Sequence, residues 1–133
     1  MKRSIDHQDE MLQKWEEVYK RGLLSFWLLL LLSQRPAYPR EIDQALAEIS
    51  LDSISADDNS IYRALSRFED MGIVSSELQQ SELGPPRKYY NLNEKGLRLL
   101  ARFIQRNILI FEDARVKEHI RAVIAKADQL GEA

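Results

Sequence analysis

The sequence predicts a mainly α-helical fold with one small β-hairpin, and two observations lead to this fold class. Apolar residues recur every three or four positions in several stretches, which is the period of a helix. One later segment instead combines β-branched residues and tyrosines around Gly84, Pro85 and Pro86, which is typical of two strands joined by a turn. The 133 residues are enough for a single domain with one core.

The composition narrows the class of protein further. A content of 44% hydrophobic and 30% charged residues is that of a soluble globular chain. The chain has no cysteine, which excludes disulfides, cysteine zinc sites and cysteine nucleophiles, and fits the reducing cytoplasm. Its longest apolar stretch, residues 22–32, is well short of the roughly 20 residues that cross a membrane. We therefore expect a cytoplasmic protein without a membrane segment.

Two helical segments are predicted before the first proline. An amphipathic helix over residues 6–21 carries Leu12, Trp15, Val18 and Tyr19 on one face, and Gly22 is expected to interrupt it. Residues 23–32 then continue as a helix that is apolar on every side and ends at 33–36. Such a helix must be buried, either by its own domain or by a partner.

Two shorter helices follow. Pro39 occupies a first-turn position, and the helix after it buries a stripe at spacings of three and four. A loop over 50–56 leads to a second helix at 57–72, which Asp57, Asp58 or Asn59 caps and Gly72 ends. The expected buried residues are Ile42, Ala45, Leu46 and Ile49 in the first, and Ile61, Ala64, Leu65, Phe68 and Met71 in the second.

A hairpin and a helical C-terminus complete the chain. Strands are predicted at 73–78 and 88–92, joined by a tip that the two prolines stiffen. Asn93 is expected to cap a final helix that packs against another helix along its length. Its apolar residues form two registers: Leu97, Leu100, Ala101, Ile104, Ile108 and Phe111, then Val116, Ile120, Val123, Ala127 and Leu130.

Three helices followed by a hairpin is the order of a winged helix-turn-helix, flanked here by N- and C-terminal dimerisation helices. In that arrangement the last helix before the hairpin enters the major groove of DNA, and the hairpin, or wing, reaches the flanking backbone. The expected organisation is an N-terminal helix at 1–21, a winged-helix DNA-binding domain at 22–92 and a helical dimerisation segment at 93–133.

The helix at 57–72 keeps several polar side chains outside its buried stripe: Asn59, Ser60, Tyr62, Arg63, Ser66 and Arg67. These are residue types that read base edges or hold phosphates. Arg87 and Lys88 place two cations on the wing. Each group also has an interpretation without DNA. Arg67 and Asp70 suit a solvated ion pair within the helix, worth about 0.2–0.5 kcal/mol. A basic pair beside a turn, such as Arg87 and Lys88, is commonly solvated surface.

Two blocks of sequence carry a family resemblance. SIYRALSRFEDMGIV at 60–74 and GPPRKYYNLNEKG at 84–96 resemble the recognition helix and the wing of the PadR transcriptional regulators, in the right order and spacing. The resemblance implies sequence-specific binding of double-stranded DNA, most simply as a repressor at a promoter. It maps the DNA-contacting positions to Ser60, Tyr62, Arg63 and Arg67 and to Arg87 and Lys88.

The entry to the second helix departs from the family pattern. RPAYPREI at 35–42 has Pro39 where the family has glycine and Arg40 where it has tyrosine. A contact made through that tyrosine is therefore not expected here, and Arg40 becomes a candidate phosphate contact.

The resemblance also implies a homodimer in which the C-terminal helix packs on the partner's N-terminal helix. The candidate interface residues are Leu12, Trp15, Tyr19, Ile104, Ile108, Phe111, Ile120 and Val123. Some members bind phenolic or other aromatic effectors between subunits, which makes Trp15 and Trp27 candidate pocket residues, although aromatics on apolar helix faces are more often plain core. The leading helix and short C-terminus also resemble cyanobacterial members, one of which modifies the circadian clock.

Catalysis has little support in the sequence. His7 and His119 lie near opposite ends, no nucleophile stands beside a base in a recognisable motif, and the 5 glycines are scattered. No cofactor or metal is expected. The net charge of -2 leaves a protein-protein adaptor open as an alternative, as is a small-molecule sensor. Cations are present both on the helix expected to enter the DNA groove, at Arg63, and on the wing, and this favours double-stranded DNA as the partner.

Overall fold

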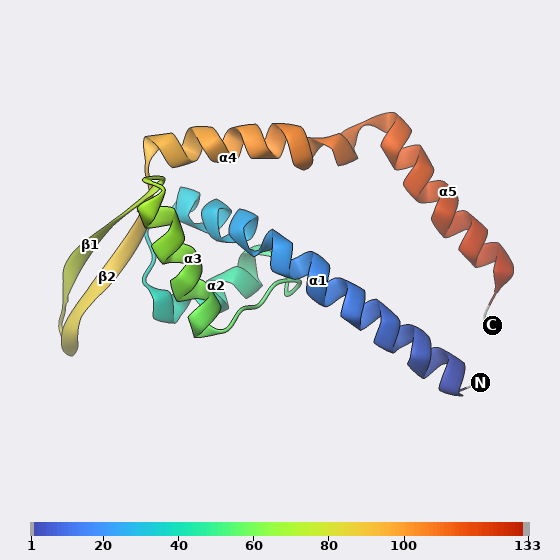
Figure 1. The fold of residues 1–133 in the computed structure, drawn as a ribbon, viewed down its shortest axis with the longest axis horizontal. Coiled ribbons are helices and arrows are strands. Elements are labelled where there is room, and N and C mark those ends of the chain that lie inside the picture. The colour runs from blue at the N-terminus through green and yellow to red at the C-terminus, as the bar shows by residue number, and fades with distance from the viewer. Residues whose placement is uncertain (1, 132–133) are drawn as a thin grey trace. The chain divides into compact units, whose positions relative to one another are not determined.

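The computed structural model describes residues 2–131, with side chains from residue 7 onward. It confirms a mainly helical fold with one antiparallel hairpin (Figure 1). The elements are α1 (Lys2–Gln34), α2 (Pro39–Ile49), α3 (Asp58–Asp70), β1 (Val74–Ser81), β2 (Gly84–Leu92), α4 (Glu94–Asn107), the short 3-10 helix η1 (Leu109–Glu112) and α5 (Ala114–Leu130). None of the helices within this range is long and apolar enough to cross a membrane.

The chain divides into two compact units. One is Lys20–Leu100, which contains the end of α1, α2, α3, the hairpin and the start of α4. The other consists of Met1–Tyr19 and Ala101–Ala133. The unit Lys20–Leu100 contains the buried core, and we call it the winged-helix unit.

The core of the winged-helix unit is aliphatic. Its largest fully buried side chains come from all three helices and from the residue before β1: Leu28, Leu32, Ile42, Leu46, Ile61, Leu65 and Ile73. Each contributes about 1.5–3 kcal/mol of transfer free energy on burial. The buried stripes predicted for α2 and α3 are therefore confirmed for most of their residues, although Ile49 at the end of α2 is only half-buried. They turn the opposite face of α3 outward.

The first helix differs from the prediction in its continuity. Gly22 does not interrupt it, since α1 is continuous from Lys2 to Gln34. A glycine inside a helix costs only about 1 kcal/mol relative to alanine, too little to break a helix with long helix-forming segments on both sides. Of residues 23–32, for which the sequence predicts burial by the chain's own domain or by a partner, four of the five leucines at 28–32 are buried, whereas Leu30 and residues 23–27 are half-buried.

Local capping defines both ends of α3. At its start the Asp57 carboxylate accepts a hydrogen bond from the Ser60 backbone N–H at 2.7 Å. Beyond its end Gly72 has a φ of 76°, as predicted for a left-handed terminator. Met71, predicted as part of the buried stripe, is 48% exposed, because α3 ends at Asp70 and the chain is already turning at Met71.

The hairpin is longer than predicted and its tip lies elsewhere. Pairing runs from Val74 opposite Leu92 to Ser81 opposite Gly84, so the turn falls between those two residues and the prolines lie inside β2. The register is irregular between Gln79 and Ser81, opposite the proline segment. Proline has no N–H to donate, which is why the ladder is disrupted there.

An isolated antiparallel β-bridge joins Ala37 to β2. The N–H of Ala37 donates to the carbonyl of Tyr90 at 3.0 Å, and the N–H of Tyr90 donates back at 2.8 Å. The root of the wing is thus joined by backbone hydrogen bonds to the segment between α1 and α2.

The predicted single C-terminal helix is interrupted. Asn93 caps α4 by accepting the Gly96 N–H at 2.9 Å, as expected. α4 then ends at Asn107, and Asp113 caps a separate helix, α5, by accepting the Arg115 N–H at 2.8 Å. An aspartate in extended conformation followed by a free N–H is a start signal for a new helix, and it overrides the continuous apolar spacing.

Candidate nucleic-acid interface

The outward face of α3 carries the residues predicted to read DNA. Asn59, Tyr62, Arg63 and Arg67 are exposed, Tyr62 to 53%. Ser60 is half-buried, and its N–H is already donated to the N-cap. Of the predicted α3 residues, four therefore remain open to an approaching molecule.

The two arginines of α3 are not committed to carboxylates. Within the part of the chain that the structure describes, neither Arg63 nor Arg67 forms an ion pair. Arg63 makes only a long 3.4 Å bond from its Nε to the Asn59 carbonyl, and Arg67 lies 5.6 Å from the ring centre of Phe68. The solvated Arg67–Asp70 pair, considered as an alternative from the sequence, is not formed.

A groove runs between the first turn of α2, α3 and β2. Three predicted cations line it, Arg40 from α2 and Arg87 and Lys88 from the wing. Tyrosines and one carboxylate, Asp58, complete much of its wall. The structure therefore brings together predicted cations that are up to 48 positions apart in the sequence, Arg40 and Lys88.

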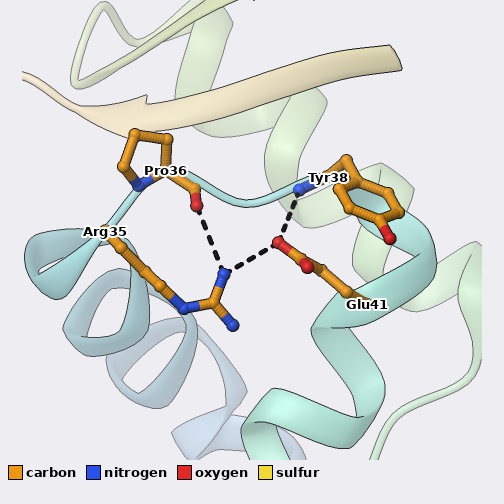
Figure 2. A network of polar contacts seen from close by, with 4 residues as sticks. All are labelled: Arg35, Pro36, Tyr38 and Glu41. Atoms are coloured by element: carbon orange, nitrogen blue, oxygen red, sulfur yellow. Dashed lines mark hydrogen bonds and ion pairs between the residues drawn. The ribbon is translucent and has the colours of Figure 1, made fainter. Parts of the chain in front are cut away.

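Polar contacts fix the segment that leads into α2 (Figure 2). The Arg35 guanidinium donates to Glu41 Oε1 at 2.8 Å and to the Pro36 carbonyl at 3.3 Å. The same Glu41 oxygen accepts the Tyr38 N–H at 3.4 Å, which satisfies a free donor at the start of the helix. This network fixes the segment that precedes Arg40, which lines the groove at the position where the family pattern has tyrosine.

The two wing cations lie on opposite faces of the hairpin, as the alternation of a strand requires. The guanidinium of Arg87 lies 4.5 Å from the ring centre of Tyr38, and that ring meets Tyr89 edge-on at 5.2 Å. A contact of this kind is worth about 0.5–1 kcal/mol at an exposed site. Tyr38, which the sequence did not mark as a site residue, therefore orients Arg87.

Lys88 faces α3 instead. Its ammonium lies 3.4 Å from Glu69 Oε1, and the other oxygen of Glu69 accepts a 2.5 Å hydrogen bond from the Ser76 hydroxyl. The Ser76 hydrogen bond, followed by the charge of Lys88, lowers the pKa of the Glu69 carboxyl. The sequence did not mark Glu69 as a site residue, because only the strand register reveals which residues it meets.

The predicted dimer residues leave apolar surface uncovered. Trp15 is 73% exposed, Val123 67% and Phe111 50%, and no described side chain between 101 and 131 is buried. Leu12, Tyr19 and Ile120 are also exposed, while Ile104 and Ile108 are half-buried. Exposed apolar residues on amphipathic helices are typical of surfaces that bind another chain.

The aromatic effector pocket stays a prediction. Trp27 is half-buried and contacts Phe26 edge-on at 5.3 Å, which is what a side chain in ordinary core packing does. Among the described side chains, no cluster of histidine and carboxylate residues resembles a metal site.

The fold and the groove define the chain as a winged helix-turn-helix protein with an exposed recognition helix. The profile of the Transcriptional regulator PadR-like family matches residues 28–102, more than half of the chain, and the chain belongs to this family. Members of the family are transcriptional regulators and not enzymes, which confirms the non-catalytic interpretation. No curated protein sequence matches the chain.

Solved structures agree with this fold. A PadR family transcriptional regulator from Eggerthella lenta DSM 2243 is 24% identical with a TM-score of 0.63, and the match covers 96% of this chain and 97% of that one. A PadR-like transcriptional regulator from Bacillus cereus strain ATCC 14579 is 28% identical with a TM-score of 0.58, covering 77% and 92%. These structures support the fold, and the resemblance to cyanobacterial members stays a prediction.

Proposed function

We propose that the chain binds double-stranded DNA sequence-specifically as a homodimer and represses transcription at a promoter in the cytoplasm. One observation carries this proposal. Arg40 on α2 and Arg87 on the wing line the groove, and Arg63 lies on the outward face of α3. All three are exposed, and none forms an ion pair within the described residues. In this arrangement α3 enters the major groove and the flanking cations hold phosphates.

Local charge, rather than the net charge of -2, decides the binding. Two carboxylates of this region already have partners, since Asp57 caps α3 and Glu69 pairs with Lys88. Asp58 remains open at the groove wall. The lining of the groove therefore carries three cations and one carboxylate, which favours an anionic partner over a protein surface.

Dimerisation supplies the second half of the proposed DNA site. The uncovered apolar residues of α1 and α5 provide surface for a partner copy. A two-fold dimer places two copies of α3 in successive major grooves, about 34 Å apart, on an inverted repeat. Affinity for two half-sites then exceeds that for one because the second contact is intramolecular.

The direct test replaces Arg63 by alanine. Labelled duplexes enriched by the wild-type protein from a randomised library are titrated by fluorescence anisotropy over a salt series. Arg63→Ala is expected to cost about 1–3 kcal/mol on the enriched duplex and much less on an unrelated one, because a bidentate arginine-base contact is lost. Wild-type affinity should fall steeply with salt.

Arg98→Ala is the matched control. It removes the same charge from α4, where Arg98 pairs with Glu94 outside the groove. The control should bind almost as wild type does. Equal losses in both variants, or a wild-type protein without salt-dependent binding to any duplex, would refute DNA reading by α3.

A further inference from the structure

One carboxylate joins the recognition helix to both strands of the wing. Glu69 lies in the last turn of α3, and each of its oxygens has a partner on a different strand. Oε2 accepts from the hydroxyl of Ser76 on β1 at 2.5 Å, and Oε1 meets the ammonium of Lys88 on β2 at 3.4 Å. Ser76 pairs with Tyr90, two positions from Lys88, so both partners belong to the same face of the hairpin.

The wing depends on this contact with α3 because the side chains of its outer half are exposed. The strand residues at 77–80 and 82–88 are exposed, and the buried anchors Val74 and Tyr90 lie at the root. A two-stranded hairpin is only marginally stable by itself. On this face the Glu69 contacts are polar links beyond the buried root, while Arg87 and Tyr38 form the link on the other face.

Lys88 keeps the capacity to bind DNA while it is held. Its side chain is 46% exposed, and an ammonium has three donors, of which Glu69 takes one. The ammonium also lies 5.3 Å from the ring centre of Tyr90. A lysine confined in this way loses less side-chain entropy when it meets a phosphate.

We propose that Glu69 is a positioning residue for DNA binding, which ties the wing to the recognition helix and holds Lys88 at the groove. The inference rests on the proposed function, since it concerns how the same interface is organised. It assigns a favourable role to a negative charge beside the surface that meets DNA, which simple charge repulsion does not predict.

The test uses the fact that repulsion and positioning predict opposite changes in DNA affinity when the charge of Glu69 is removed. Glu69→Gln removes a negative charge that makes the joint. Glu77→Gln removes one from β1 at the position after Ser76, where the exposed carboxylate accepts a hydrogen bond from Gln79 of its own strand at 3.2 Å and forms no ion pair among the described residues. Repulsion alone predicts tighter DNA binding for both variants. Positioning predicts that Glu69→Gln weakens binding about 2- to 10-fold while Glu77→Gln does not.

Two further measurements complete the experiment. In a double-mutant cycle, Lys88→Gln should weaken binding less in the Glu69→Gln background than in wild type. Without DNA, backbone amides of β1 and β2 should exchange hydrogen faster in Glu69→Gln than in Glu77→Gln. If Glu69→Gln does not fold, Ser76→Ala removes only the β1 arm and should change binding and exchange in the same directions.

The outcomes separate the two proposals. Wild-type protein that binds neither the enriched nor an unrelated duplex refutes the proposed function, and the role of Glu69 in DNA contact falls with it. Binding by the wild type together with equal affinities of Glu69→Gln and Glu77→Gln overturns the positioning role alone. Unchanged amide exchange in Glu69→Gln overturns the joint itself.

Discussion

A single methyl group at Gly96 is expected to destabilise the winged-helix unit. Gly96 lies in the first turn of α4, against the start of the hairpin. A Cβ atom there would lie 2.2 Å from the backbone oxygen of Ile73 and 2.4 Å from Cδ1 of Leu92. The Ile73 carbonyl also accepts the Asn93 N–H at 3.2 Å, so it cannot move away without disturbing the junction of wing and helix.

The magnitude follows from two opposing terms. Forcing an extra carbon into a filled site costs about 1–3 kcal/mol, and a clash with backbone belongs in the upper part of that range. Replacing glycine by alanine in a helix returns at most about 1 kcal/mol. Gly96→Ala should therefore lower the free energy of unfolding by about 1–2 kcal/mol.

Gly22→Ala provides the matched control for this prediction. Gly22 also lies in a helix, but nothing comes within 4 Å of its added Cβ. This variant should be stabilised by up to about 1 kcal/mol. Urea unfolding followed by circular dichroism measures both, at equal protein concentration because association alters apparent stability. A Gly96→Ala protein as stable as wild type would refute the reasoning, as would equal losses in both variants.

Two predictions concern the helix cap and the dimer. The backbone hydrogen bond from Ser60 lowers the pKa of Asp57, so its contribution to stability is present above the ordinary aspartate pKa of 3.8 and is lost as the pH falls through the folded value. Asp57→Ala should therefore have a lower melting temperature than wild type at neutral pH, and the difference between the two melting temperatures should shrink in acid. A difference in melting temperature that does not depend on pH would exclude the charged cap. On α5, Val123→Glu should convert dimer to monomer in sedimentation velocity, whereas Ala122→Glu, off the apolar stripe, should not. A wild-type protein that sediments as a monomer at micromolar concentration would disprove the dimer geometry.

Several elements could be predicted from the sequence because their determinants lie within a few residues of one another. The buried stripes of α2 and α3 follow from helical spacing, and the ends of α3 and the start of α4 follow from Asp57, Gly72 and Asn93. Once the stripe of α3 is known, its outward face is known as well. The exposed positions of Tyr62, Arg63 and Arg67 were therefore determined by local periodicity.

Other features depended on contacts that spacing does not encode. Gly22 is a weak helix former, yet α1 continues through it. Asp113, in contrast, caps a new helix and so divides the C-terminal segment, whose apolar spacing predicted one continuous helix. Whether a local preference prevails depends on the free energy of the packing around it.

The wing shows the same limit at the proposed DNA interface. Strand register decides that Lys88 faces Glu69 and that Arg87 faces Tyr38, and a shift of one residue would exchange them. The sequence by itself determined which residues are available to bind DNA. Only the tertiary structure decided which of them are held in place, because each partner lies on another element and distance in space is not a function of distance along the chain.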